Sequence, residues 1–399
     1  MKVLLAPDKF KGSLTAAQVA GHLSTGLRSA SGGIDLVSVP VADGGDGTLQ
    51  AAVRAGFTHV PVRVRGPVGE PVDSGYARRG DTAVLELADA CGLVRLPAGV
   101  PAPLTASSTG FGDLIRAALD DGCHTLVLAV GGSASTDGGA GMLTALGARM
   151  LDGAGNDVPP GLGSLPDIDR IDLTGLHPGI AAAQFVLACD VDNPLLGPTG
   201  AAAVYGPQKG VTDTPAAEAA LTHFAVRLAH AQGIPGQEAG QIHPAAHAAG
   251  AGAAGGVGFA GNACLRARLR PGIDYLLDLT GFHRGLVDAD LVITGEGRLD
   301  EQTLHGKAPA GVAAAARAAG IPVIAVAGRN DLTDEQLTAA GFTAAYSLLD
   351  IEPDPTRCLA HPGPILEQLA RQVIGRHHLP ATPTGPAATH HTTTLENAS

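Results

Sequence analysis

The chain has 399 residues, of which 45% are hydrophobic and 3% aromatic, with 56 glycines, no tryptophan and a net charge of −12. This length suggests two domains, and the mix of small apolar residues with many turn-forming glycines is typical of an α/β protein. Scarce aromatics and an acidic balance argue against nucleic-acid binding, since such proteins present basic faces and stacking rings. Local groups would have to overcome the overall field to bind an anion.

The five cysteines are scattered, odd in number and without a CxxC pair, so we expect reduced thiols in a cytoplasmic protein. The first residues read as a strand and a loop, and are too poor in apolar residues for a signal peptide. No apolar run reaches membrane-spanning length, so we expect no membrane partner.

The amino-terminal part predicts two strand–loop–helix units. A buried strand at 3–6 precedes a helix at 15–29, for which Thr15 is a suitable N-cap. A second strand at 36–41 leads into a helix at 47–55. This order is typical of a parallel sheet whose site lies at the carboxyl ends of the strands.

The pattern changes in the middle of the chain. Short strands at 60–65, 74–79 and 82–87, joined by turn residues, predict hairpins. The elements predicted next are a helix at 109–120, a strand at 125–130, a helix at 138–150, a strand at 185–189 and a helix at 215–231.

The opening pattern returns after residue 288. It predicts strands at 291–294, 323–327 and 344–348, separated by helices at 307–319 and 334–340. The simplest arrangement is a discontinuous flavodoxin-like parallel sheet, in which the first and third strands are neighbours. The loop at 7–14 is then expected beside the loop at 295–303.

We therefore predict an α/β protein of two domains. Residues 1–58 and 288–376 form the flavodoxin-like domain, and 59–287 form an inserted second α/β domain. Residues 377–399 are rich in Pro, Thr, His and Ala without periodicity and predict a disordered tail.

The lysines are the sharpest internal signal. Only five of the 26 basic residues are lysines, and all but Lys2 lie in or beside Gly-rich loops: Lys9, Lys11, Lys209 and Lys307. A compact ammonium suits a crowded phosphate site, whereas a guanidinium suits a planar fork. The plainer alternative is that they are surface charges, and for Lys307 the two interpretations are about equal.

The run 131–139, Gly-Gly-Ser-Ala-Ser-Thr-Asp-Gly-Gly, stands between a predicted strand and a predicted helix. Such a loop presents backbone N–H groups and a helix N-terminus to an anion, and Ser133, Ser135 and Thr136 add hydroxyl donors, so we favour anion binding. Ser135, Thr136 or Asp137 could instead simply cap the helix.

Carboxylates also gather in these loops, and together could hold Mg²⁺ and offer a base to a hydroxyl. They are Asp8, Asp43, Asp46, Asp137, Asp190, Asp192, Glu296 and Asp300. Asp190 follows an apolar strand directly, which favours a functional role, whereas Asp43 and Asp46 could merely cap a helix.

Two common nucleotide motifs are excluded. Gly250–Gly255 and Gly256–Gly261 both match GxGxxG, but neither follows a predicted strand, so a dinucleotide site is not expected. Gly306-Lys307-Ala308 lacks the hydroxyl residue of a Walker A loop.

Seven collinear segments, spread over roughly residues 1–375, resemble the bacterial glycerate kinase family. They are APDKFKGSLTA (6–16), PVADGGDGT (40–48), GGSASTDGGAGML (131–143), CDVDNPLLGPTGAA (189–202), GPQKG (206–210), GAGAAGGVG (250–258) and DLVITGEGRLDEQT (290–303). The resemblance implies ATP-dependent phosphorylation of D-glycerate at the 2-hydroxyl, giving 2-phosphoglycerate and ADP. It also implies that the inserted domain is restriction-endonuclease-like. The 3-hydroxyl remains an alternative acceptor.

Residue roles follow from chemistry, because phosphoryl transfer needs positioning and charge neutralisation. The catalytic candidates are Lys9, Lys11, Asp190 as base, and Arg298 as a fork for the substrate carboxylate. The candidates for binding ATP or substrate are Ser13, Ser133, Ser135, Thr136, Asp137, Asn193, Lys209, Glu296, Asp300, Thr303 and Lys307. The candidate Mg²⁺ ligands are Asp43 and Asp46.

A second class of function stays open: a non-catalytic sensor of a small anionic metabolite. Carboxylates beside the cations favour an enzyme, because a sensor does not need them. The expected partner is D-glycerate, with no nucleic acid; a homodimer is one option for the oligomeric state.

Overall fold

The computed structural model describes residues 1–42, 44–234, 240–304 and 306–374. The tail predicted to be disordered therefore lies outside the described residues. Within the described ranges, none of the helices combines the length and apolar character needed to cross a bilayer.

The first sheet is parallel and draws on both ends of the chain. It contains β1 (Lys2–Pro7), β2 (Asp35–Ser38), β11 (Leu291–Leu299), β12 (Val323–Asn330) and β13 (Ala344–Ser347). The order β13-β12-β11-β1-β2 is the predicted flavodoxin-like order, with Pro7 of β1 opposite Gly295 of β11.

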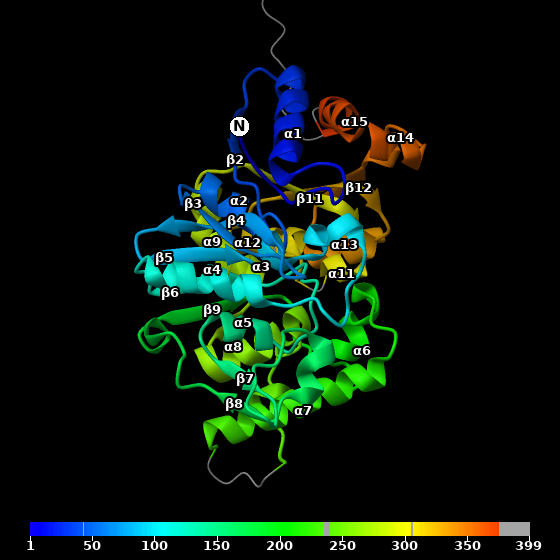
Figure 1. The fold of residues 1–399 in the computed structure, drawn as a ribbon. Coiled ribbons are helices and arrows are strands. Elements are labelled where there is room, and N and C mark those ends of the chain that lie inside the picture. The colour runs from blue at the N-terminus through cyan, green and yellow to red at the C-terminus, as the bar shows by residue number, and fades with distance from the viewer. Residues whose placement is uncertain (43, 235–239, 305, 375–399) are drawn as a thin grey trace, which may run out of the picture.

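Helices cover both faces of this sheet because its strands are apolar on both sides. Val3 and Leu5 pack toward α1 (Ala16–Ala30) and α15 (Pro362–Leu369), while Leu4 and Ala6 pack toward α12 (Ala308–Ala318). Thr15 caps α1 as predicted, in a capping box with Gln18. Figure 1 shows α1, α14 (Pro355–Ala360) and α15 together at one end of the molecule.

The second sheet has six strands in the order β10-β9-β6-β5-β4-β3. The predicted hairpins are confirmed, because β3 pairs antiparallel with β4, and β4 with β5; the remaining pairs are parallel. The strands are β3 (Thr58–Arg65), β4 (Pro71–Arg79), β5 (Thr82–Glu86), β6 (Thr125–Ala129), β9 (Gln184–Ala188) and β10 (Arg268–Arg270).

One face of this sheet carries the largest apolar core of the molecule. Phe111, Phe224 and Phe259 are fully buried in it. The helices here are α3 (Leu87–Cys91), α4 (Thr109–Asp120), α5 (Ala140–Ala145), α6 (Ala201–Tyr205), α7 (Thr214–Gln232) and α8 (Val257–Leu265), and β7 (Arg149–Leu151) pairs with β8 (Arg170–Asp172). Figure 1 shows α7 at the end of the molecule opposite α1.

The helices α2 (Thr48–Arg54) and α9 (Gly272–Thr280) pack between the two sheets. Leu49 and Ala52 of α2 pack on the other face of the second sheet, and α9 packs beside them. Ile273 and Leu277 of α9 also belong to the core of the first sheet, as does Phe282 of α10 (Phe282–Leu286). The domain boundaries after residues 58 and 287 stay a prediction.

Three predicted elements have different ends in the structure. The helix predicted at 138–150 is wrong beyond Ala145, since Gly147 has a φ of +107° and the next residues enter β7. The strand predicted at 291–294 continues to Leu299, because β12 is long enough to pair with it through Asn330. The strand predicted at 36–41 ends at Ser38.

The remaining helices are short. They are α11 (Glu301–Leu304) and α13 (Asp334–Ala340). The helix predicted at 334–340 is confirmed, with Thr333 as its N-cap.

Two glycines of α1 predict opposite effects on stability. A Cβ at Gly26 would fall on the Glu367 carbonyl and lie 2.7 Å from the Ala370 Cβ, whereas a Cβ at exposed Gly21 would meet nothing. Gly26→Ala should therefore lower the free energy of unfolding by about 2 kcal/mol. Gly21→Ala should raise it by about 0.5–1 kcal/mol, because alanine is the better helix former. Urea unfolding of both variants checks this pair; two equal changes would contradict the described packing of α1 on α15.

Candidate active site

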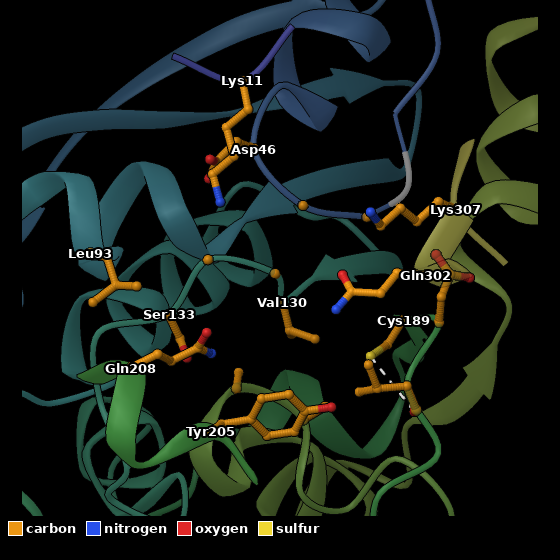
Figure 2. Close-up of a pocket in the computed structure, with 18 of the residues that line it drawn as sticks. Lys11, Asp46, Leu93, Val130, Ser133, Cys189, Tyr205, Gln208, Gln302 and Lys307 are labelled. Atoms are coloured by element: carbon orange, nitrogen blue, oxygen red, sulfur yellow. Dashed lines mark hydrogen bonds between the residues drawn. The ribbon is translucent and has the colours of Figure 1, made fainter. Parts of the chain in front are cut away.

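A cavity of about 860 Å³ opens where the carboxyl ends of both sheets face each other. The first sheet contributes Asp8, Lys9 and Lys11 after β1, the turn at 44–46 after β2, and the end of β11 with the residues after it. The second contributes residues 130–133 after β6, residues 189–193 after β9, and Tyr205, Gln208 and Lys209. Parallel strands place ligand sites at this edge. Figure 2 shows side chains entering the cavity from both parts.

The loops after β1 and β11 meet as predicted. The Asp8 backbone N–H donates to the Gly295 carbonyl over 2.8 Å. Lys9 Nζ donates to the Asp46 carbonyl oxygen over 2.5 Å, so the β1 loop is also tied to the turn after β2. Figure 2 shows the Lys11 side chain extending into the cavity beside Asp46. The loop after β1 thus brings two predicted lysines, Lys9 and Lys11, to the cavity beside the end of β11.

A second group of charges lies at the end of β11. Lys307 Nζ is 3.6 Å from both Glu296 Oε2 and Asp300 Oδ1. Arg298 Nε is 2.6 Å from Asp331 Oδ2 and 3.9 Å from Asp300 Oδ2. All of these residues except Asp331 were predicted site residues, and those four line the cavity. Each cation lies beside carboxylates, which hold the cations in place and limit the net positive charge that a ligand meets.

Two predicted residues near these groups lie off the wall. Thr303 is buried, and its hydroxyl donates to Glu296 Oε1 over 2.6 Å, so it orients that carboxylate from behind. The Ser13 hydroxyl donates to the Phe10 carbonyl within its own turn. Neither is among the residues that line the cavity.

The 131–139 loop reaches the cavity only through its first part. Ser133 lines the wall, but Ser135, Thr136 and Asp137 are buried behind it. The Asp137 carboxylate accepts hydrogen bonds from the Ser108 backbone N–H and hydroxyl, both 2.8 Å, and from Gly139 N over 3.1 Å. Asp137 therefore organises the loop from behind the wall, whereas the N-cap position of α5 is taken by Gly139, which makes no side-chain cap.

Lys209 fixes this loop from the other side. Its buried Nζ donates to Ser133 Oγ and to the Ser135 carbonyl, each over 2.6 Å. Burial lowers the pKa of the Lys209 ammonium to about 8, although nearby Asp137 and Cys91 act in the opposite direction. Two of the three N–H donors of the Lys209 ammonium are thus used in hydrogen bonds to the wall of the cavity.

Asp190 and Asn193 lie on the segment after β9, and both line the cavity. Asp190 Oδ1 accepts a hydrogen bond of 2.7 Å from Gly272 N at the start of α9, which fixes the orientation of the carboxylate. Asn193 Oδ1 accepts from the Tyr205 hydroxyl over 2.6 Å. The predicted base thus reaches the cavity from an anchored position.

The predicted metal ligands are only partly placed. Asp43 lies outside the described residues, and Asp46 lines the cavity. The described part of the chain holds no group of three or more His, Cys, Asp or Glu side chains arranged around a single point. Mg²⁺ commonly takes one or two protein carboxylates and completes its shell with water and substrate phosphates. Asp46 is a hard oxygen donor on the wall and fits such a site.

Glu86 is a residue that the sequence reasoning missed. It ends β5, is buried, and accepts hydrogen bonds from Gly47 N over 3.1 Å and Leu49 N over 2.9 Å. It therefore caps α2 from the second sheet and holds the turn that carries Asp46. Burial raises the pKa of Glu86 to about 7, against the lowering effect of those two backbone donors. An acidic residue ending an otherwise apolar strand (82–86, TAVLE) was the available signal.

Glu86 makes stability depend on pH. Its pKa is about 7 in the folded chain and 4.5 ordinarily, so folding takes up a proton between these values. Wild-type stability should fall, relative to Glu86→Gln, as pH rises from about 4.5 to about 7. Urea unfolding gives the free energy of unfolding of Glu86→Gln and of wild type. We expect the value of the variant minus that of wild type to be greater at pH 8 than at pH 5, by more than about 1 kcal/mol.

Exposed Glu335 supplies the control for this prediction. Its pKa is lowered by its own backbone N–H and by Thr333, so Glu335→Gln should show no such gain at high pH. Parallel stability profiles for wild type and Glu86→Gln would contradict the assignment of a raised pKa to Glu86.

Comparison with known proteins places this architecture in a family. Residues 3–378 match the glycerate kinase family. Glycerate kinase of Bacillus subtilis (strain 168) is 41% identical over 96% of this chain and 99% of its own length. Glycerate 2-kinase of Escherichia coli (strain K12) is 41% identical over 88% and 91%. The crystal structure of a "putative glycerate kinase 2" from Salmonella typhimurium LT2 superposes with a TM-score of 0.78 at 41% identity, covering 94% of this chain and 98% of that one. The chain, an α/β enzyme with its charged cavity between two sheets, belongs to the glycerate kinase family.

Proposed function

We propose that this enzyme transfers the γ-phosphoryl group of ATP to the 2-hydroxyl of D-glycerate, giving 2-phosphoglycerate and ADP. The observation that carries the proposal is the cavity in which Lys9, Lys11, Lys307 and Arg298 stand beside carboxylates. Such a set can neutralise a triphosphate and also accept a hydroxyl proton. A relative named glycerate 2-kinase supports the choice of hydroxyl. A cytoplasmic location and a homodimer remain predictions from the sequence.

The lysines serve the phosphates. Lys9 and Lys11 come from the β1 loop, and Lys307 from the start of α12, so the cations reach the cavity from two sides. Charge on the transferring group is spread over its outer oxygens in the transition state, and fixed cations stabilise it there. Gly131 and Gly132 also line the cavity, and their missing Cβ atoms allow Gly45 and the Asp46 carboxylate to approach closely.

In this proposal, Arg298 holds the carboxylate of D-glycerate. Its ion pairs with Asp331 and Asp300 involve Nε. Among the described residues, neither terminal nitrogen of its guanidinium makes a hydrogen bond, and the side chain is 60% exposed. A guanidinium presents a planar pair of donors that matches a carboxylate.

Asp190 takes the proton of the reacting hydroxyl. The oxygen then forms its bond to the γ-phosphorus, the bond to the β-phosphate oxygen breaks, and ADP leaves. The Gly272 N–H holds the Asp190 carboxylate toward the cavity throughout. Asp46 would hold Mg²⁺, which when bound offsets charge on the β- and γ-phosphates.

The deciding experiment combines turnover with product analysis. The full-length protein is incubated with Mg-ATP and D-glycerate, ADP release is followed, and ³¹P NMR locates the phosphate. Glycerate-dependent ADP release with phosphate on C2 is expected. Phosphate on C3 would overturn the positional assignment, and binding of D-glycerate without any turnover would favour the sensor.

Removing the base should leave binding and folding largely intact. Asp190→Asn keeps the acceptor for Gly272 N but cannot take a proton, so kcat should fall by at least about a hundredfold. Asp192→Asn, two residues along the same wall, is the matched variant and should lose far less. Steady-state kinetics with thermal unfolding as a folding check measure this; a near-normal kcat in Asp190→Asn would remove it from the base role.

The lysine argument predicts sensitivity to shape at constant charge. Lys11→Arg should lower kcat/KM for ATP by about tenfold, because a planar fork replaces a compact ammonium. Lys2→Arg is the control, since Lys2 Nζ bonds to the Val287 carbonyl and does not line the cavity. Equal kinetics for both variants would show that charge alone matters at position 11.

A further inference from the structure

One stretch of the cavity wall is unsuited to D-glycerate. The side chains of Leu93, Val204 and Tyr205 line it on the side formed by the second sheet. Figure 2 shows Tyr205 at the bottom of the view and Leu93 at its left, with Lys11, Asp46 and Lys307 in the upper part. D-Glycerate is a three-carbon acid covered with oxygens, so it gains nothing from apolar contact. These apolar side chains are therefore better suited to a flat or apolar part of a second ligand.

The Tyr205 ring is held in position. Its hydroxyl donates to Asn193 Oδ1 over 2.6 Å, and Asn193 Nδ2 in turn donates to the Thr199 carbonyl over 2.8 Å. Tyr205 is also the one aromatic residue among the described residues that line the cavity. An aromatic ring fixed by its hydroxyl leaves its π-face for stacking with a flat ligand.

Gln208 lies on the same side of the cavity. Figure 2 shows its carboxamide directed toward the cavity interior. Across the described ranges, no hydrogen bond uses this side chain. A carboxamide offers a donor and an acceptor side by side. The edge of adenine presents an amino donor next to a ring-nitrogen acceptor, which is the complementary pattern.

We propose that the adenine base of the nucleotide stacks on the Tyr205 ring against Leu93 and Val204, with the Gln208 carboxamide at its edge. This inference rests on the proposed use of ATP. The triphosphate then extends from the second-sheet side toward the lysines of the β1 loop. The two chemical halves of the nucleotide are thereby matched to the two halves of the cavity wall.

Binding of ADP to the full-length protein tests the stacking directly. In calorimetry, Tyr205→Leu should raise the Kd for ADP about tenfold, the order expected for loss of one base–aromatic stack. Tyr205→Phe keeps the ring and should raise it less. In kinetics, Tyr205→Leu should raise KM for ATP by a similar factor while KM for D-glycerate stays within about twofold.

A neighbouring pair supplies the matched control. Leu93 lines the cavity, whereas Val94 is 76% exposed and does not. Leu93→Ala should raise the Kd for ADP, and Val94→Ala should not. Gln208→Leu should reduce the preference for ATP over ITP, which lacks the amino group.

The outcomes separate the two proposals. If wild type neither binds ADP nor releases it from ATP, the proposed function fails. If wild type is active but Tyr205→Leu binds ADP with the wild-type Kd, the base lies elsewhere and this inference is overturned. An unchanged ATP-to-ITP preference in Gln208→Leu would overturn the role of Gln208. An equal rise in both KM values would point to a general disturbance of the wall and also count against the stacking assignment.

Discussion

The close approach of one turn to the edge of the second sheet determines where the cavity lies. Gly44, with a φ of +89°, packs so that a Cβ would stand 2.6 Å from the Ala188 carbonyl oxygen, and Gly131 N donates to the Gly44 carbonyl over 3.1 Å. Glu86 secures the far end of the same turn through Gly47 N. Because the turn follows β2 and its partners end β6 and β9, the carboxyl ends of the two sheets are held face to face. The charged loops of both sheets therefore share one space.

Local pairing explains how an acidic protein can present cations to an anion. The net charge is −12, yet Lys307 and Arg298 are each flanked by carboxylates that keep them in place. Lys209 shows the limit of this arrangement, because its ammonium is buried and bonded to the Ser133–Ser135 segment. The four lysines of the cavity thus divide into Lys9, Lys11 and Lys307, which we propose meet the ligand, and Lys209, whose ammonium is bonded to the wall. Their common loop location in the sequence did not separate these roles.

The sequence was most informative where short-range pattern decides structure. Apolar strands, the Thr15 cap and the expected strand order are enough to predict that Lys9 and Glu296 lie on neighbouring loops, as the pairing of β1 with β11 confirms. What it did not predict depends on partners distant in the chain. Asp137 faces inward because residues 107–108 supply donors there, and Glu86 became a cap because α2 lies over β5. The extension of β11 likewise depended on the length of β12. No window of neighbouring residues contains such information.

The pairing of β1 with β11 has a consequence for synthesis on the ribosome. Val3 pairs with Leu291, so the central pair of the first sheet cannot form until nearly three quarters of the chain has been made. The strands of the second sheet all lie between residues 58 and 270 and can assemble earlier. During that interval the apolar strands at the amino terminus have no sheet to join, and exposed strands of this kind associate readily with other chains. Slow translation of the middle of the chain would prolong this exposure. Chaperones that bind the nascent amino terminus would reduce the association with other chains.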